Sequence, residues 1–194
     1  MTRVRGLSRY LSRVFVVLGL IALGYVVYVA IDASRYQAIA RARLAEAPPA
    51  VATALAPADG DPIGDLEIPR VGLSTVVVQG ESQTTLRRAA GHLVETALPG
   101  DPGNVVLAGH RDAIFRPLRD VRVGDLIVLH TPRGVFQYRV ESTTVVPPTD
   151  LRVLEASAWR TLTLITCFPF TYVGAAPDRY VIRAREISAM APVL

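Results

Sequence analysis

A long apolar run near the amino terminus is the strongest hydrophobic pattern in the chain. Residues 14–31, VFVVLGLIALGYVVYVAI, are 18 positions without a charged side chain. As a helix they would extend about 27 Å, close to the ~30 Å thickness of a hydrocarbon core. The pattern predicts one transmembrane helix, preceded by a basic tail at residues 1–13. A cleaved signal peptide is the alternative, but its apolar region is normally shorter, about 7–15 residues.

The pattern changes twice after the apolar run. Residues 32–46 have a helical character and are expected to continue the membrane helix outward. Residues 47–62, APPAVATALAPADGDP, are rich in Ala, Pro and Gly and show little periodicity, which is typical of a linker. We therefore expect a stalk and linker over residues 32–62 and a separate domain over residues 63–194.

Short apolar runs bounded by Gly and Pro recur through this domain and predict strands. The runs cover residues 64–69, 73–79, 104–110, 125–131, 134–146, 160–166 and 179–186. Residues 82–92 are instead a short helix candidate, with Ser82 as its N-cap. Six to eight strands with so little helix predict a mainly β domain, either a closed barrel or a sandwich.

The charge distribution favours a cytoplasmic amino terminus and argues against a nucleic-acid partner. All 21 basic residues are arginines, and the net charge of +4 resides in the tail, at Arg3, Arg5, Arg9 and Arg13. A basic tail before the first span favours a cytoplasmic amino terminus. The remainder of the chain is neutral and has no basic stripe with interleaved aromatic residues. A nucleic-acid partner is therefore not expected.

Cys167, the single cysteine, stands at the end of a predicted strand in TLTLITCFPF. Strand alternation places Cys167 on the face opposite Leu162 and Leu164, so it does not extend their apolar row. Pro169 follows two residues later, and because proline cannot donate to a ladder it ends the strand near the thiol. These features favour an accessible nucleophile, while a buried structural thiol is the alternative.

Two further residues complete a candidate cysteine-enzyme site. Such a site needs a proton carrier and a donor for the developing oxyanion, in addition to the thiol. His110 ends the predicted strand in LAGHRD, and Arg179 opens the strand that follows the Cys167 loop. If the last two strands are antiparallel neighbours, Cys167 and Arg179 meet at one rim. Arg183 shares the face of Arg179 and is its main rival.

These residues resemble the sortase family. TLTLITC is similar to the family's TLxTC nucleophile strand, LAGHRD to its histidine motif, and Arg179 matches its third catalytic position. The stretches TALPGDPGNVVLAGHRDAIFRPL and TLTLITCFPFTYVGAAPDRYVIRA are most similar to class D sortases. The resemblance covers roughly residues 63–187.

The resemblance implies a closed eight-stranded sortase-type β-barrel and a membrane-anchored cysteine transpeptidase. Cys167 would cleave an LPxT-type sorting signal of a secreted protein through a thioester, with His110 as proton carrier and Arg179 as donor. The acceptor would be an amine such as a cell-wall peptide, and no cofactor or metal is expected. Apart from the resemblance, two neighbouring residues are supporting candidates. The hydroxyl or the backbone of Thr166 would help to shape the oxyanion site, and His92 would support the site from an adjacent loop, with a purely structural role as its alternative. The domain is expected outside the plasma (inner) membrane.

Two other functions remain open from the residues. An L,D-transpeptidase or another cysteine peptidase would use the same nucleophile, but the Ser-His-Gly-Cys and Gln-rich motifs of those families do not occur around Cys167. An anchored β-domain that only binds a partner would leave Cys167 inert and resistant to thiol reagents.

Overall fold

The computed structural model describes residues 2–46, 56–172 and 174–190. The chain divides into two compact units, residues 1–36 and 37–194. Helix α1, Thr2–Glu46, contains the apolar run and continues beyond it, as predicted, into the second unit. The expected linker at residues 47–62 lies largely outside the described residues.

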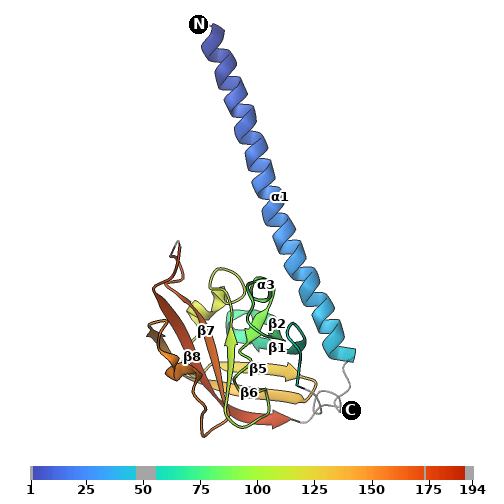
Figure 1. The fold of residues 1–194 in the computed structure, drawn as a ribbon, viewed down its shortest axis with the longest axis vertical. Helices are drawn as coiled ribbons and strands as arrows, with labels where there is room; N and C mark the ends of the chain where they lie inside the picture. The colour runs from blue at the N-terminus through green and yellow to red at the C-terminus, as the bar shows by residue number, and fades with distance from the viewer. Residues whose placement is uncertain (1, 47–55, 173, 191–194) are drawn as a thin grey trace. The chain divides into compact units, whose positions relative to one another are not determined.

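The second unit is built on eight strands that close into a barrel (Figure 1). The strands are β1 (Pro62–Ile68), β2 (Leu73–Gln79), β3 (Ala90–His92), β4 (Asn104–Ala108), β5 (Leu126–Thr131), β6 (Gly134–Val146), β7 (Thr161–Phe168) and β8 (Asp178–Met190). Their order around the barrel is β1-β2-β3-β4-β7-β8-β6-β5. Of the two architectures left open by the strand pattern, the closed barrel is confirmed.

Short helices occupy the connections between the strands. They are η1 (Pro69–Val71), α3 (Gln83–Leu86), η2 (Arg116–Asp120) and η3 (Leu151–Leu154). Two strand pairs, β2 with β3 and β4 with β7, are parallel, while the other neighbours are antiparallel. Because β4 and β7 are parallel, their carboxyl ends lie at the same rim of the barrel, where β8 begins.

Strand alternation fills the barrel interior. Leu162 and Leu164 of β7 are fully buried in one core with Leu107 of β4 and Ile182 of β8. Burying each such side chain stabilises the fold by about 1.5–3 kcal/mol. The alternate residues of β7, which include Thr163, Ile165 and Cys167, therefore belong to the outer face of the strand.

The predicted helix over residues 82–92 is only partly present. Ser82 is the N-cap, since its hydroxyl accepts the Thr85 backbone N–H at 3.2 Å, but α3 lasts only four residues. The chain then enters the short strand β3, which the sequence pattern did not predict. A Cβ at Gly91 would lie 2.5 Å from the Gly80 carbonyl oxygen, so glycine permits the close approach of these backbones.

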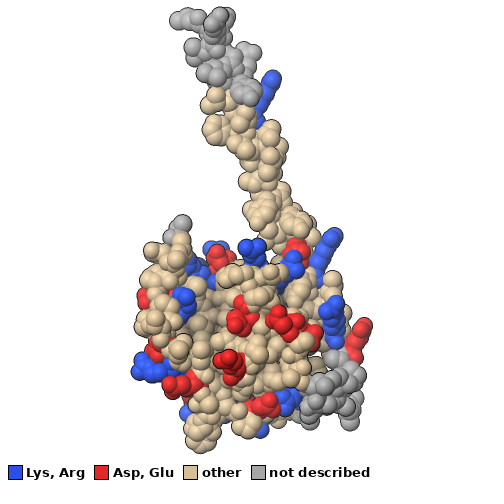
Figure 2. Space-filling model, in the orientation of Figure 1, with Lys and Arg blue, Asp and Glu red and all other residues tan. Residues whose placement is uncertain are grey.

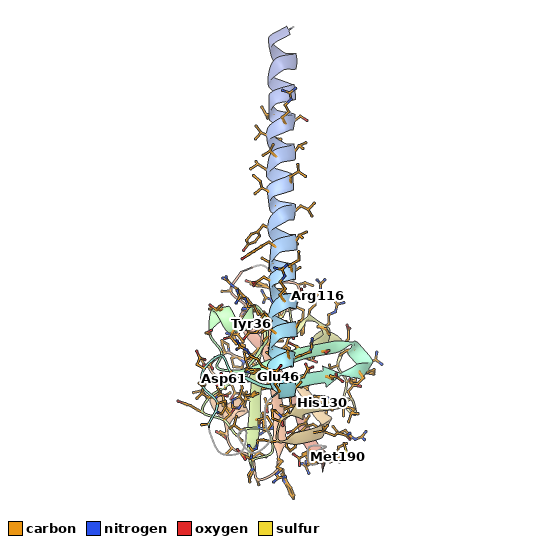
Figure 3. The ribbon with its side chains drawn as sticks, turned by 90° about the vertical axis from the view of Figure 1, so that its right-hand side faces the viewer. Tyr36, Glu46, Asp61, Arg116, His130 and Met190 are labelled. Carbon is orange, nitrogen blue, oxygen red and sulfur yellow. The ribbon has the colours of Figure 1, made fainter. Side chains whose placement is uncertain are left out.

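The apolar stretch of α1 is long enough to span a membrane, and its side chains are not buried within the structure. Figure 3 shows side chains projecting to both sides of this helix, residues 14–31 include no charged residue, and a length of the helix is tan on the face shown in Figure 2. A helix that is apolar all round is suited to a lipid environment. It is a candidate membrane span.

The end of α1 that belongs to the second unit contacts the barrel. The side-chain oxygen of Gln37 accepts the Val76 N–H of β2 at 2.8 Å, and its Nε2 donates to the Arg88 carbonyl at 2.6 Å. Arg41 forms a bidentate ion pair with Asp65 of β1, at 2.8 and 3.2 Å. Ala40 is buried between them. These contacts make the last turns of α1 part of the barrel unit.

Candidate active site

The candidate residues come together on three neighbouring strands, with β7 in the centre. Cys167 pairs directly with Arg179 of β8 across the antiparallel ladder. On the other side, Ala108 of β4 pairs with Ile165 of β7 in a parallel register. β4 ends at Ala108, and His110 follows two residues later, beyond the paired residues; continued that far, the same register would bring His110 level with Cys167. The candidate histidine and arginine thus come from the two strands that flank β7, and all three residues are partly exposed.

Gly109 fixes the backbone immediately before His110. Its N–H donates to the Ile165 carbonyl at 3.2 Å, and its own carbonyl accepts the Thr166 hydroxyl at 2.7 Å. A Cβ at Gly109 would lie 2.7 Å from the Phe115 ring. Phe115 is fully buried and donates its N–H to the His110 carbonyl at 3.0 Å. His110 is thus held to β7 on one side and to the core on the other.

The Thr166 hydroxyl is directed away from the face of Cys167. Thr166 is buried and shares the interior face with Leu164. Its only hydrogen is donated to Gly109, so it is not available to an oxyanion at Cys167 in this arrangement. The structure thus gives the hydroxyl a different partner from the oxyanion site that the sequence suggested.

The guanidinium of Arg179 is turned toward its own loop. Its Nη1 donates to the Asp178 carbonyl at 3.0 Å and more weakly to the Ala176 carbonyl at 3.4 Å. The rival Arg183 pairs with Thr163, four residues from Cys167 along β7, which is about 13 Å at the usual strand rise. Register therefore favours Arg179 over Arg183 as the arginine beside the thiol.

His92 is fully buried and belongs to β3 rather than to a loop. Its Nδ1 is 2.9 Å from the side-chain oxygen of Gln79, and its Nε2 is 2.9 Å from the Ala97 carbonyl and 3.2 Å from the Thr96 hydroxyl. Burial lowers the pKa of His92, an effect that outweighs the Ala97 carbonyl, which favours the charged ring. The ring joins β2 and β3 to the turn that follows, and these hydrogen-bond partners include none of Cys167, His110 and Arg179.

His130 lies elsewhere in the barrel. It is on β5, which is not a neighbour of β4, β7 or β8, and its side chain is 47% exposed and 3.9 Å from Glu67. Figure 3 labels it on the barrel surface. Within the ranges described, no group of three or more His, Cys, Asp or Glu side chains is placed to hold a metal ion.

The connection between β6 and β7, residues 147–160, is hydrogen-bonded to the first residue of β4. It leaves β6 at Val146, which pairs with Arg179 at the active rim, and enters β7 at Thr161. Asn104 holds it midway, because its Nδ2 donates to the carbonyls of Val153 and Glu155 at 3.0 and 3.2 Å. Its side-chain oxygen accepts the Thr163 hydroxyl at 2.7 Å, on the Cys167 face of β7. Asn104 thus joins the connection to β4 and, through Thr163, to the outer face of β7.

Sequence reasoning missed three residues that shape this site: Gly109, Asn104 and Arg111. The signal for Gly109 was its place directly before His110. Asn104 opens β4 and is 2% exposed, but the distant carbonyls that it binds are not visible in the local pattern. Arg111 follows His110 and reaches the loop after Cys167, a contact that only the folded chain reveals.

A thiol flanked by an imidazole and a guanidinium on one rim can carry out acyl transfer. The thiol provides a nucleophile, the imidazole moves a proton, and the guanidinium N–H groups donate to a developing oxyanion. The sortase domain model matches residues 66–187 of this chain. The chain belongs to the sortase family. Sortases are cysteine transpeptidases, so the chain is an enzyme of this class.

Individual relatives agree with this family. Sortase D of Bacillus subtilis strain 168 is 34% identical over 133 residues, which cover 68% of this chain and 67% of that protein. Sortase A of Listeria monocytogenes is 30% identical over 109 residues, and the match covers 54% of this chain and 49% of the Listeria protein. The likeness to a sortase D confirms the class suggested by the sequence motifs.

Solved structures show the same barrel. A Clostridium perfringens sortase D5 transpeptidase aligns with a TM-score of 0.70 at 28% identity, covering 80% of this chain and 98% of that one. Sortase A of Corynebacterium diphtheriae aligns with a TM-score of 0.62 at 29% identity, covering 68% of this chain and 63% of that one. The predicted sortase-type barrel is therefore confirmed.

Proposed function

We propose that this chain is a membrane-anchored sortase in which Cys167, His110 and Arg179 form the catalytic site. The observation that supports the proposal is the register of three neighbouring strands: Cys167 pairs with Arg179 of β8, and His110 follows the end of β4, which pairs with β7 as far as Ile165. The partial exposure of Cys167 supports a reacting rather than a structural thiol.

The first half-reaction forms a thioester. The Cys167 sulfur attacks the threonine carbonyl of an LPxT-type sorting signal, and the peptide C–N bond breaks. The one proton that Cys167 and His110 hold between them is on His110 once the sulfur has attacked, and His110 donates it to the leaving amine. Arg179 turns from its loop carbonyls and donates to the substrate backbone or to the oxyanion. The amino-terminal part of the secreted protein remains attached to Cys167.

The second half-reaction transfers this acyl group. An amine, such as that of a cell-wall peptide, attacks the thioester carbonyl, and its proton passes to His110. The C–S bond breaks, an amide forms, and the thiol is restored. This sequence of two displacements is ping-pong chemistry, and the residues named here carry it without a metal or organic cofactor.

Thr166 and His92 have supporting roles in this proposal. Thr166 positions His110 through the Gly109 carbonyl rather than by contact with the oxyanion. His92 holds the turn after β3 as a buried neutral ring. Both act through other residues.

We place the chain in the plasma membrane as a single-pass protein. The apolar stretch of α1 supplies the candidate span, and the arginines before it favour a cytoplasmic amino terminus. The barrel then lies on the extracytoplasmic side, where secreted substrates are found. On the face shown in Figure 2, acidic and arginine side chains of the barrel are interspersed and form no continuous basic stripe.

Intact-mass spectrometry of the full chain in detergent micelles tests the proposal. The chain is mixed with a panel of LPxTA and LPxTG peptides. We expect a mass increase equal to the amino-terminal part of a peptide, absent in Cys167→Ala and removed by added triglycine. If none of the peptides gave an adduct, the LPxT assignment would be overturned. If the adduct were lost to water alone, without added triglycine, the enzyme would be a protease.

Matched variants test the other two residues. His110→Ala should slow acylation by about 10²–10⁴-fold, the usual contribution of a positioned proton carrier, whereas His130→Ala should not. Arg179→Ala should lose about 10²–10³-fold, as expected for an oxyanion donor, whereas Arg183→Ala should stay near the wild-type rate. Equal losses within either pair would contradict the assignment.

A further inference from the structure

Arg111 connects the histidine turn to the loop that follows the nucleophile. It is the residue directly after His110, and its Nη2 donates to the carbonyls of Tyr172 and Gly174 at 2.7 and 3.2 Å. Both acceptors belong to the loop between β7 and β8, which joins Cys167 to Arg179. One side chain thus links the segments that carry all three catalytic candidates.

The outer part of this loop has little other support among the described residues. Its base is packed, because Phe170 contacts Tyr180 edge-on with a centroid distance of 5.3 Å. Beyond the base, Tyr172 is 48% exposed, and Gly174 and Ala175 are also exposed. The Arg111 guanidinium lies over the Tyr172 ring, 5.8 Å from its centroid. Figure 1 shows the loop projecting beyond the ends of β7 and β8. The other hydrogen bonds of this part of the loop, Tyr172 N–H to the Pro169 carbonyl and Arg179 Nη1 to the Ala176 carbonyl, are long, both 3.4 Å, so Arg111 makes the shortest contact to the outer loop among the described residues.

One nitrogen of the Arg111 guanidinium is left without a hydrogen-bond partner in the described part of the chain. Nη1 of Arg111 is buried and has no hydrogen-bond partner among the residues that the structure describes. A buried donor without an acceptor is unfavourable, which offsets part of the stabilisation from the two bonds made by Nη2. The net stabilisation of the loop by Arg111 is therefore smaller than two hydrogen bonds alone would give.

We propose that Arg111 is a positioning residue that sets the partition of the acyl-enzyme between amine transfer and hydrolysis. This inference rests on the proposed function. His110 serves the leaving amine in the first half-reaction and the incoming amine in the second. A loop tethered to the residue after His110 therefore borders the path of both amines. While the loop is closed, it orders the acceptor and restricts the access of water.

The competing reactions differ only in the nucleophile. In transfer, the amine nitrogen attacks the thioester carbonyl, its proton passes to His110, and the C–S bond breaks to give an amide. In hydrolysis, water attacks the same carbonyl, gives its proton to His110, and leaves a free carboxylate. The chemistry at Cys167 is shared, so release of the loop changes the product ratio more than it changes thioester formation.

The test uses Arg111→Gln and Arg111→Lys in the full chain in micelles, with Arg116→Gln as the matched control. Arg116 is an exposed arginine of η2 in the same segment. Hydrogen exchange of the loop amides is measured without substrate. Thioester formation with the LPxT peptides, and the ratio of triglycine product to hydrolysed product, are then measured separately.

For Arg111→Gln we expect faster exchange in the loop, while the β4 and β7 amides stay protected. The product ratio should fall by about tenfold, the factor that corresponds to one lost charge-assisted hydrogen bond, while kcat/KM for thioester formation changes by less than about threefold. Arg111→Lys should be intermediate, since lysine keeps the charge but not the two-pronged geometry. Arg116→Gln should match the wild type.

Two results would overturn the inference: unchanged loop exchange in Arg111→Gln, or an equal loss of thioester formation and amine transfer, which would indicate a merely structural role. Both are distinct from failure of the proposed function. If the wild-type chain forms no thioester with any LPxT peptide, the proposed function is contradicted, and the inference about Arg111 is contradicted with it. If the thioester forms and the ratio does not respond to Arg111, only the inference fails.

Discussion

Gly109 and Thr166 together determine where His110 lies. Gly109 accepts the Thr166 hydroxyl and donates to Ile165, and its missing Cβ leaves room for the buried Phe115 ring. Thr166, which precedes Cys167, thus holds Gly109, which precedes His110. If His110 is the proton carrier that we propose, this support matters, because a misplacement of about 1 Å can cost about 10²-fold in rate.

Replacing the Thr166 hydroxyl tests this coupling. Thr166→Val keeps the shape of the side chain but leaves the buried Gly109 carbonyl without a donor, which costs about 1–3 kcal/mol. We expect a lower melting temperature and thioester formation slowed by about 10–10²-fold, since His110 is no longer held in place. Thr166→Ser, which keeps the hydroxyl, should recover most of the rate. An unchanged rate in Thr166→Val would show that the hydroxyl has no catalytic consequence.

The buried His92 should make the folded barrel less stable as the pH falls. Because burial lowers the pKa of His92, the unfolded chain binds this proton more readily than the folded barrel. The stability is therefore fully present above the ordinary pKa near 6.5 and is lost as the pH falls from there toward the lowered folded-state value. The slope from this one group is at most about 1.4 kcal/mol per pH unit.

Thermal unfolding between pH 8 and pH 5 measures this effect. His92→Gln should be less stable than the wild type at pH 8, because it disturbs the contacts to Gln79 and Ala97, but it should lose less stability on acidification. His130→Gln removes a half-exposed histidine and should keep the wild-type slope. Equal slopes for the wild type and His92→Gln would mean that another group carries the acid sensitivity.

At the scale of elements, the sequence was most informative where alternation and Gly/Pro boundaries were clear. Strand β6 was predicted with its exact bounds, and the antiparallel pairing of the last two strands, which the sequence analysis assumed when it brought Cys167 and Arg179 together, is present. The three-residue strand β3 was missed because it is too short to show a period. Its pairing depends on Gly91 approaching Gly80, a contact between segments that local propensity does not register.

The remaining features of the site depend on contacts between distant segments. Asn104 and Val153 are 49 residues apart, and Arg111 and Tyr172 are 61 apart. Neither pairing follows from composition or periodicity, whereas the candidate catalytic residues were visible at strand ends. The sequence therefore supplied the candidate nucleophile and its proposed partners, while the groups that position them required the folded barrel.

The connection between β6 and β7 provides a prediction at this scale. Asn104→Leu removes both donors to the carbonyls of Val153 and Glu155 and the acceptor for Thr163. We expect hydrogen exchange over residues 151–156 to rise by about tenfold or more, with KM for the LPxT peptides raised more than kcat is lowered. Asp150→Asn, which keeps a side-chain acceptor at the N-cap of η3, is the control for local fraying. Unchanged exchange would show that other contacts hold the connection.

At the scale of the whole molecule, the barrel unit begins within α1 rather than at the first strand. Gln37 satisfies the Val76 N–H at a position of β2 that lies before its pairing with β3, which begins at Val77. The same side chain donates to Thr75 and Arg88, and Arg41 binds Asp65 one turn later. The helix thus completes the hydrogen bonding of a strand edge, so the last turns of α1 contribute to the stability of the barrel.

Two shortened chains measure this contribution. A chain that begins at residue 32 keeps Gln37 and Arg41, whereas one that begins at residue 47 leaves the buried Val76 N–H without its partner, at a cost of about 1–3 kcal/mol. For a domain of this size that corresponds to a melting temperature lower by roughly 2–10 °C. Within the longer chain, Gln37→Ala should reproduce most of the decrease, whereas Arg43→Ala, an exposed arginine on the same helix, should not. Equal melting temperatures for the two chains would show that β1 to β8 fold independently of α1, and the barrel unit would then begin at β1.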